Sequence, residues 1–154
     1  MILHTEIGPL SIGYIHGSFV CDFGTVVVER DPSKKVVQQL EKYFDGEIIH
    51  EFDAPLPQGT PFTHRCWEAC RQIPYGSTCT YKELATAAGS PQAARAAGQA
   101  MRNNPTSILT PCHRVVASTG KLHGFAGQTN PQSKELRRKA YLLHLEQTAI
   151  LRVS

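Results

Sequence analysis

Hydrophobic and polar residues alternate along the first part of the chain in a way that predicts a small α/β unit. Apolar residues recur at every second position over residues 10–14, which is the period of a half-buried strand. The β-branched run at residues 25–28 and the run at residues 48–52 are predicted to be two further strands. Between them, apolar positions at helical spacing predict a helix that begins at Asp31 and Pro32 and ends at Gly46.

A proline-rich stretch divides the chain. Residues 54–61 contain three prolines and a glycine, which interrupt strands and helix interiors. We therefore take residues 54–61 as a linker. It separates an N-terminal α/β domain, residues 1–56, from a mainly helical domain, residues 61–154.

Helical spacing and capping residues predict the helices of the second domain. Apolar residues at helical spacing predict a first helix between residues 62 and 73. Thr80 and Glu83 have the spacing of a capping box, so a short helix should follow them. Ser90 and Pro91 predict the start of another helix, and Ser133 that of the last. Two short helices around a Gly-Ser turn resemble a helix-turn-helix, although an ordinary helical hairpin fits equally well.

Charge is distributed unevenly over the 154 residues. The net charge is +3, but residues 1–60 carry four Lys and Arg against nine Asp and Glu, whereas residues 61–154 carry twelve against four. This basic second half predicts a polyanionic partner, and we favour nucleic acid over a merely solvated basic surface. No apolar run is long enough to span a membrane, so we expect an intracellular protein without a membrane anchor.

The cysteines do not have the pattern of a disulfide framework, because they are odd in number and irregularly spaced: Cys21, Cys66, Cys70, Cys79 and Cys112. Cys66 and Cys70 share one helix face, which is typical of a buried apolar stripe. Cys21 with His4 and His16 offers metal-ligand residue types, but the spacing matches no zinc pattern, so no metal is expected.

The strongest candidate chemistry lies in the apolar run at residues 108–116. Cys112, His113 and Arg114 place a nucleophile, a base and a cation side by side. The thiolate is the reactive form of cysteine, and a nearby base or positive charge favours it. Adjacent residues do not face each other on regular elements, so this triplet alone does not establish a catalytic site.

Several motifs in their order resemble the O6-alkylguanine-DNA alkyltransferase family: IPYG at residues 73–76, YKELA at 81–85, ARAAGQAMRNNP at 94–105, PCHRV at 111–115 and YLLHLE at 141–146. The likeness covers about residues 60–147. The N-terminal part resembles the family only in size and α/β character.

The resemblance implies a ribonuclease H-like N-terminal domain followed by a winged helix-turn-helix-like domain that binds DNA and carries the catalytic site. It implies direct reversal of damage, in which Cys112 takes an alkyl group from O6 of guanine, and by extension from O4 of thymine, in one irreversible step. His113 and Glu146 would form the relay that removes the thiol proton through a water molecule, and Asn104 would hold the active-site turn. The family needs no cofactor, and we expect a monomer.

The resemblance also implies contacts with double-stranded DNA, and hence a location in the cytoplasm (nucleoid) or the nucleus. Tyr81 would press on the phosphate 3′ to the target, and Arg95 would replace the flipped base in the stack. Ala94, Arg102 and Arg114 are further DNA-binding candidates, with structural ion pairs as the alternative for the two arginines. Base flipping is required because O6 of a paired guanine lies inside the duplex. In the family the wedge enters from the minor groove.

The pocket for the alkylated base is predicted to include Val115, Phe125 and Gly127. The family commonly has a tyrosine followed by two glycines in this loop, whereas the chain has FAGQ at residues 125–128. Phe125 still supplies an aromatic wall but lacks the hydroxyl, so methyl transfer should survive while the size preference for larger alkyl groups is open. A hairpin around residues 118–120 is predicted just before this loop.

Three other functions fit parts of the pattern. Alkyltransferase-like proteins only mark the lesion and lack the acceptor cysteine, which this chain has as Cys112. A sequence-reading regulator would need more base-edge contacts than Arg95 provides. A cysteine hydrolase would need an oxyanion hole, for which the sequence gives no sign.

Overall fold

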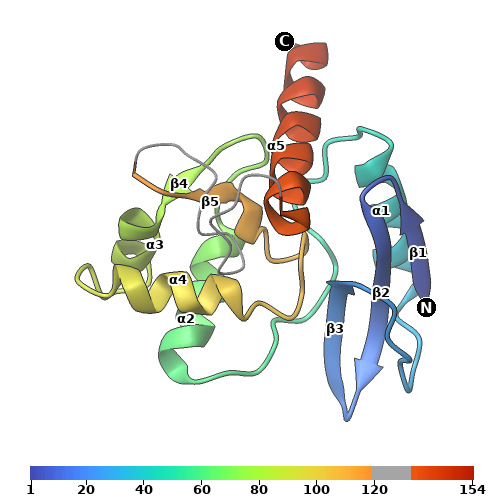
Figure 1. Cartoon of the computed structure of the whole chain (residues 1–154), viewed down its shortest axis with the longest axis horizontal. Helices are drawn as coiled ribbons and strands as arrows, with labels where there is room; N and C mark the ends of the chain where they lie inside the picture. Colours follow the sequence, from blue (N-terminus) through green and yellow to red (C-terminus); the bar gives the residue numbers. More distant parts are fainter. Residues whose placement is uncertain (119–132) are drawn as a thin grey trace.

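Three antiparallel strands and one helix form the N-terminal part of the molecule (Figure 1). The structure is a computed structural model that describes residues 1–118 and 133–154. The sheet order is β1-β2-β3, with strands β1 (Ile2–Thr5), β2 (Gly8–Ile15) and β3 (Ser18–Phe23). Helix α1 (Lys34–Phe44) and the sheet share one core, in which Leu10, Ile12, Val36, Leu40 and Tyr43 are buried. The alternation at residues 10–14 thus belongs to a strand, as predicted.

Two of the predicted strands are wrong. Residues 25–28 and 48–52 form no strand; Val27, for example, is 90% exposed. A β-branched run becomes a strand only when a neighbouring backbone pairs with it, and β2 pairs with β1 and β3 instead. The strands β1 and β3 were not predicted.

The start of α1 also differs from the prediction. The side chain of Ser33, not Asp31, accepts a hydrogen bond from the backbone N–H of Val36, at 3.3 Å. Asp31 instead pairs with the N-terminal ammonium of Met1 at 3.3 Å. The helix therefore begins at Lys34, two residues later than expected.

Helices dominate the second part: α2 (Pro61–Arg71), α3 (Tyr81–Ala87), α4 (Ala94–Arg102) and the final helix α5 (Lys134–Val153). A 3-10 turn, η1 (Cys112–Arg114), and two short parallel strands, β4 (Cys79–Thr80) and β5 (Val115–Val116), lie among them. The capping box is confirmed, because Glu83 N–H donates to the Thr80 hydroxyl at 3.1 Å and Thr80 N–H donates to the Glu83 carboxylate at 2.9 Å.

Ser90 does not cap a helix, contrary to the prediction. Its N–H donates to the carbonyl of Ala85 at 2.9 Å and so closes the end of α3, while α4 begins only at Ala94 without a side-chain cap. Of the predicted hairpin, Val115 and Val116 form a strand, but they pair with β4 in parallel. Residues 119–123 of that hairpin lie outside the described residues.

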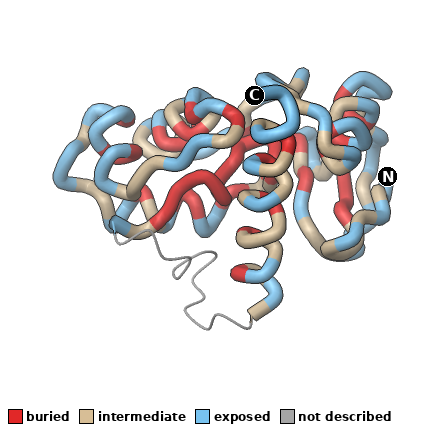
Figure 2. Tube along the Cα trace, turned by 90° about the horizontal axis from the view of Figure 1, so that it is seen from above, coloured by how far each residue is buried: buried red, intermediate tan, exposed pale blue. Residues whose placement is uncertain are grey.

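Helix α5 lies between the two parts of the molecule (Figure 1). Leu142 and Ala149 of α5 join the N-terminal core, as do Ile108 and Leu109, whereas Cys112 and Val115 join the core of α2, α3 and α4. Residues 108–116 are all buried, and Figure 2 shows a continuous buried stretch through the centre of the molecule. Within residues 1–118 and 133–154, no helix is both long and apolar enough to cross a membrane.

Candidate active site

Cys112 follows a turn that is held together by the side chain of Asn104. The Asn104 amide donates to the carbonyl of Thr110 at 2.8 Å, and its oxygen accepts from the backbone N–H of Thr106 at 3.0 Å. The hydroxyls of Thr106 and Thr110 lie 2.9 Å apart. Asn104 and both threonines are buried, so these bonds are shielded from water. They tie the two ends of the turn that leads into Cys112.

The N-terminal sheet also supports this turn. Cys21 of β3 donates its N–H to the carbonyl of Pro105 at 2.9 Å and accepts from Ser107 N–H at 2.7 Å. The Ser107 hydroxyl donates to Asp22 at 3.0 Å. Ile108, next in the chain, is buried with a φ of 73°, a conformation that costs a β-branched residue about 1–3 kcal/mol. The pairing with β3 and the Asn104 bonds offset that cost.

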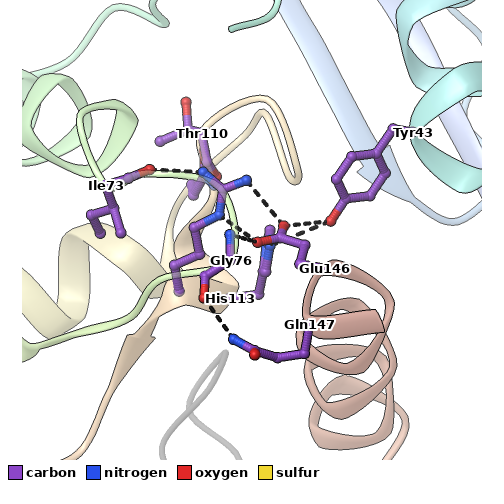
Figure 3. A network of polar contacts seen from close by, with 9 residues as sticks. Tyr43, Ile73, Gly76, Thr110, His113, Glu146 and Gln147 are labelled. Atoms are coloured by element: carbon purple, nitrogen blue, oxygen red, sulfur yellow. Dashed lines mark hydrogen bonds and ion pairs between the residues drawn. The ribbon is translucent and has the colours of Figure 1, made fainter. Parts of the chain in front are cut away.

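His113 and Glu146 form the centre of a buried polar network (Figure 3). His113 Nε2 lies 2.7 Å from Glu146 Oε2, and both side chains are 1% exposed. Because Nε2 faces a carboxylate, we assign the ring proton to Nε2 and leave Nδ1 as the acceptor. Among the described residues, buried Nδ1 has no hydrogen-bond partner. The relay predicted between these two residues thus has its hydrogen bond in place.

Two further contacts to Glu146 were missed by sequence analysis. The hydroxyl of Tyr43, on α1, donates to Oε2 at 2.7 Å, and the backbone N–H of Gly76 donates to Oε1 at 3.0 Å. Gly76 has a φ of 81°, and a Cβ there would lie 2.7 Å from Ile150 Cγ1, so only glycine fits. Gln147 also donates to the Gly76 carbonyl, at 2.6 Å. The IPYG motif of the sequence is the signal that accounts for Gly76.

Arg114 belongs to this network and does not contact the surface. Its Nε donates to Glu146 Oε1 at 2.9 Å, its Nη2 to Oε2 at 3.0 Å and its Nη1 to the carbonyl of Ile73 at 2.8 Å. With 4% of the residue exposed, Arg114 is not available to DNA. The DNA-binding role predicted for Arg114 is therefore replaced by its alternative, a structural ion pair.

These contacts set the charge states of the site. Burial alone would raise the pKa of Glu146, but hydrogen bonds from His113 and Arg114 and the arginine charge hold that pKa well below its usual range. Burial lowers the pKa of His113 despite the neighbouring carboxylate, so the imidazole is neutral at pH 7. Burial also raises the pKa of the Cys112 thiol, although the Asn104 side chain and the charge of Lys139 lower it in part. Cys112 therefore needs a base to become a thiolate.

A cavity of about 220 Å³ gives access to Cys112. Asp22, Met101, Arg102, Asn104 and Ser107 are among the residues that line it. The Val115 side chain lies in the core of the helical part instead, and Phe125 and Gly127 lie outside the described residues. A larger cavity of about 600 Å³ does not include Cys112.

Three of the residues predicted to act on DNA lie at the starts of α3 and α4, and a fourth, Arg102, is the last residue of α4. Tyr81 is the first residue of α3. Burial, together with the nearby charge of a Cys112 thiolate, raises the pKa of the Tyr81 hydroxyl to about 12. Arg95 is exposed in the first turn of α4, next to Ala94. Gly98 of α4 lies against the Tyr81 ring, at 3.7 Å from the position of a Cβ. The small residues of α4 thus let this helix pack closely on α3.

Metal chemistry has no ligand set in the part of the chain that the structure describes. No group of three or more His, Cys, Asp or Glu side chains is placed to hold an ion within residues 1–118 and 133–154. Cys21, one of the ligand types considered, is fully buried in the N-terminal core, and all five cysteines are free thiols.

The fold and site define a class of protein: a two-part α/β protein in which a cysteine lines a cavity and is followed by a neutral, buried histidine bound to a buried glutamate. The family model described as "6-O-methylguanine DNA methyltransferase, DNA binding domain" matches residues 61–148. The methylated-DNA–protein-cysteine methyltransferase of Methanosarcina barkeri is 45% identical over 158 residues, 95% of each chain. That of Mycobacterium tuberculosis is 39% identical over 158 residues, 95% of this chain and 90% of the relative.

Solved structures give the same result. Crystal structures of the Mycobacterium tuberculosis O6-methylguanine methyltransferase, alone and in complex with DNA, each match with a TM-score of 0.77. Their identities are 37% and 36%, over 96% of this chain and 92% of theirs. The chain therefore belongs to the 6-O-methylguanine DNA methyltransferase family.

Proposed function

We propose that this protein repairs alkylated DNA by transferring the alkyl group from O6 of guanine to Cys112. Family membership gives the activity, which is methylated-DNA–protein-cysteine methyltransfer by direct reversal. The observation that carries the assignment is the site itself: Cys112 opens onto a cavity, and the next residue is a neutral, buried His113 bound to Glu146. O4-alkylthymine, with the same alkyl–oxygen linkage, is the second substrate we expect.

The reaction follows from the charges of the site. The Cys112 proton passes through one water molecule to Nδ1 of His113, and Glu146 stabilises the resulting imidazolium through Nε2–H. The thiolate attacks the alkyl carbon, so a sulfur–carbon bond forms while the carbon–O6 bond breaks and its electron pair returns to the guanine. The proton held by His113 then neutralises the guanine. No cofactor is needed because these steps balance, and the protein is consumed because the thioether is stable.

Tyr81, Ala94, Arg95 and Arg102 are the residues we propose for the contact with double-stranded DNA. The support is their position: Arg95 is exposed on the small-residue helix α4, and Arg102, at the other end of α4, lines the cavity of Cys112. An arginine on such a helix can enter the stack while the target base turns into the cavity. Tyr81 holds the phosphate backbone beside it.

We extend the proposal to the architecture and the setting. A division into residues 1–56 and 61–154 is supported by the two cores, although α5 contributes to the first of them. We interpret the first part as ribonuclease H-like and the second as winged helix-turn-helix-like, in which α3 and α4 form the helical pair. The protein acts as a monomer on genomic DNA, in the cytoplasm (nucleoid) or the nucleus.

The experiment that tests this function measures the fate of the methyl group. Purified protein is mixed with excess duplex that contains one O6-methylguanine, and the modified peptide is mapped by mass spectrometry. We expect one methyl on Cys112 per protein and no further turnover. Cys112→Ser should bind the lesion duplex without transfer, whereas Cys79→Ser, a control at another thiol, should transfer normally. Methyl transfer by Cys112→Ser would contradict the assignment, and binding without transfer by the parent would identify a lesion-marking protein.

A further inference from the structure

A lysine is completely buried against the segment that follows Cys112. Lys139 of α5 has none of its surface exposed, and its Nζ donates to the carbonyl of Val115 at 2.6 Å. Lysine is almost never fully buried unless it is paired, because removing an ammonium from water is costly. The bond to Val115 holds this ammonium against the segment that contains Cys112.

Lys139 and Glu146 meet the same segment of chain from the same face of α5. They are seven residues apart, close to two turns, so they lie about 10 Å from one another along the helix. Glu146 binds His113 and Arg114, while Lys139 binds the carbonyl of Val115. The helix thus presents a negative charge and a positive charge to the one segment that begins with Cys112.

The positive charge of Lys139 changes the pKa values of the groups that take part in the reaction. Lys139 lowers the pKa of both Cys112 and His113, and its Nζ lies 6.0 Å from the ring centre of Tyr81. Asp22 of β3 acts in the opposite direction, since its negative charge raises the pKa of Cys112. The charged and titratable neighbours of Lys139 and the thiol thus come from η1, α3 and β3.

We propose that Lys139 is a positioning residue of the transfer reaction, which fixes the Val115 carbonyl and supplies the positive charge that stabilises the Cys112 thiolate. The inference rests on the proposed function, in which Cys112 is the acceptor. Glu146 stabilises the imidazolium that forms when the proton leaves, and Lys139 stabilises the thiolate that the proton leaves behind. Both products of the proton transfer then have a counter-charge on α5.

The effect depends on pH in a defined direction. Burial lowers the pKa of Lys139 to about 8, and the negative charge of a Cys112 thiolate raises it. Below about pH 8 the ammonium is charged and favours the thiolate. Above that pH Lys139 loses its proton, so the advantage over a neutral side chain should shrink.

The test measures the reactivity of the Cys112 thiol directly. The rate of Cys112 alkylation by iodoacetamide is followed against pH by peptide mass spectrometry in the full-length protein. Lys139→Met keeps the length of the side chain and removes its charge, Lys139→Arg keeps the charge, and Arg137→Met removes an exposed charge from the same helix. An opposite charge near a thiol lowers its pKa by about one unit or more. We therefore expect the Lys139→Met rate at pH 7 to fall about tenfold, and its difference from the parent to shrink above about pH 8.

The controls separate charge from packing. Lys139→Arg should keep most of the parent's profile, and Arg137→Met should match it. A Lys139→Met profile that coincides with the parent's would overturn the proposal, as would equal shifts in Lys139→Met and Lys139→Arg. If thermal denaturation shows that Lys139→Met is unfolded, Lys139→Gln, which is neutral but can still donate to Val115, takes its place with the same expectations. A parent protein that transfers no methyl group would instead overturn the proposed function.

Discussion

Replacing Tyr43 with phenylalanine removes one hydroxyl from the interior and keeps the aromatic ring. Tyr43 is fully buried, and its ring packs edge-on against Phe44 and Tyr75. The hydroxyl donates to Glu146 Oε2 at 2.7 Å, and burial together with the carboxylate raises the pKa of the phenol, so it remains a donor. Tyr43→Phe therefore removes the short bond to Glu146, and with it the longer contact of the same hydroxyl with His113 Nε2 at 3.5 Å.

The expected loss of stability depends on the hydrogen bonds that Glu146 retains in the variant. A hydrogen bond to a charged group contributes about 1.5–3 kcal/mol to stability. Oε2 still accepts from His113 at 2.7 Å and from Arg114 at 3.0 Å, so no acceptor is left without a donor. We therefore expect a decrease of about 1.5–2 kcal/mol in the free energy of unfolding, near the lower end of that range. For a chain of this size the melting temperature should fall by about 3–8 °C.

Urea denaturation at pH 7 measures this loss, with Tyr141→Phe as the matched control. The Tyr141 hydroxyl also donates to a carboxylate, Glu6 Oε2 at 3.1 Å, but this bond is exposed to water. We expect Tyr141→Phe to cost less than about 0.5 kcal/mol, as surface substitutions usually do. Equal costs for the two variants would refute the reasoning, because they would show that burial of the Tyr43–Glu146 bond adds nothing to its strength.

Two further predictions concern Glu146 and Arg95. Glu146→Gln should lower the unfolding free energy by about 3–5 kcal/mol, because it leaves the charge of Arg114 buried without its partner. The pKa of Glu146 is lower in the folded state than in the unfolded state. The stability that the ionised carboxylate contributes is therefore complete above the unfolded pKa of about 4.3 and is lost as the pH falls towards the folded pKa. The difference in unfolding free energy between parent and variant should shrink when denaturation is measured from pH 7 down to pH 3. Arg95→Ala should slow repair of duplex DNA far more than reaction with the free base O6-benzylguanine, and equal losses in the two assays would contradict a role in base flipping.

Local sequence signals predicted the helices better than the strands. The capping box at Thr80 and the Ser133 cap are confirmed, because each depends on residues within one helical turn. Residues 25–28 have strand composition and lie near β2, yet they form no strand, and the nearest bridge to β2 joins Tyr14 and Arg30. Strand formation depends on a partner that is distant in sequence, and composition does not reveal which partner a segment will find. Ser90 was misread because the same serine-proline pattern also suits the turn that ends α3.

The residues of the site were also predictable where a local motif marks them, and not where they depend on distant parts of the chain. Cys112 and His113 could be named because they form part of a motif, and Glu146 because a second motif ends on it. Tyr43 could not, since it lies 103 residues from Glu146 and has no motif around it. Arg114 shows the opposite error: an arginine in a basic, DNA-binding half was taken for a DNA contact, but its guanidinium faces inward and pairs with Glu146. The charge pattern of the sequence indicates whether a surface is acidic or basic, but the packing of the fold determines which charged side chains are exposed there.

The N-terminal part carries no catalytic motif, yet the site depends on it from two directions. Cys21 and Asp22 of β3 hold the turn before Cys112, and Tyr43 of α1 holds Glu146 at the far end of the relay. Helix α5 then completes both the N-terminal core and the network around His113. Because the contacts of Cys21, Asp22 and Tyr43 span 84 to 103 residues of sequence, the helical part does not hold the relay in place by local structure alone. The acidic N-terminal part is therefore a structural component of the active site, which explains why the two parts share one helix.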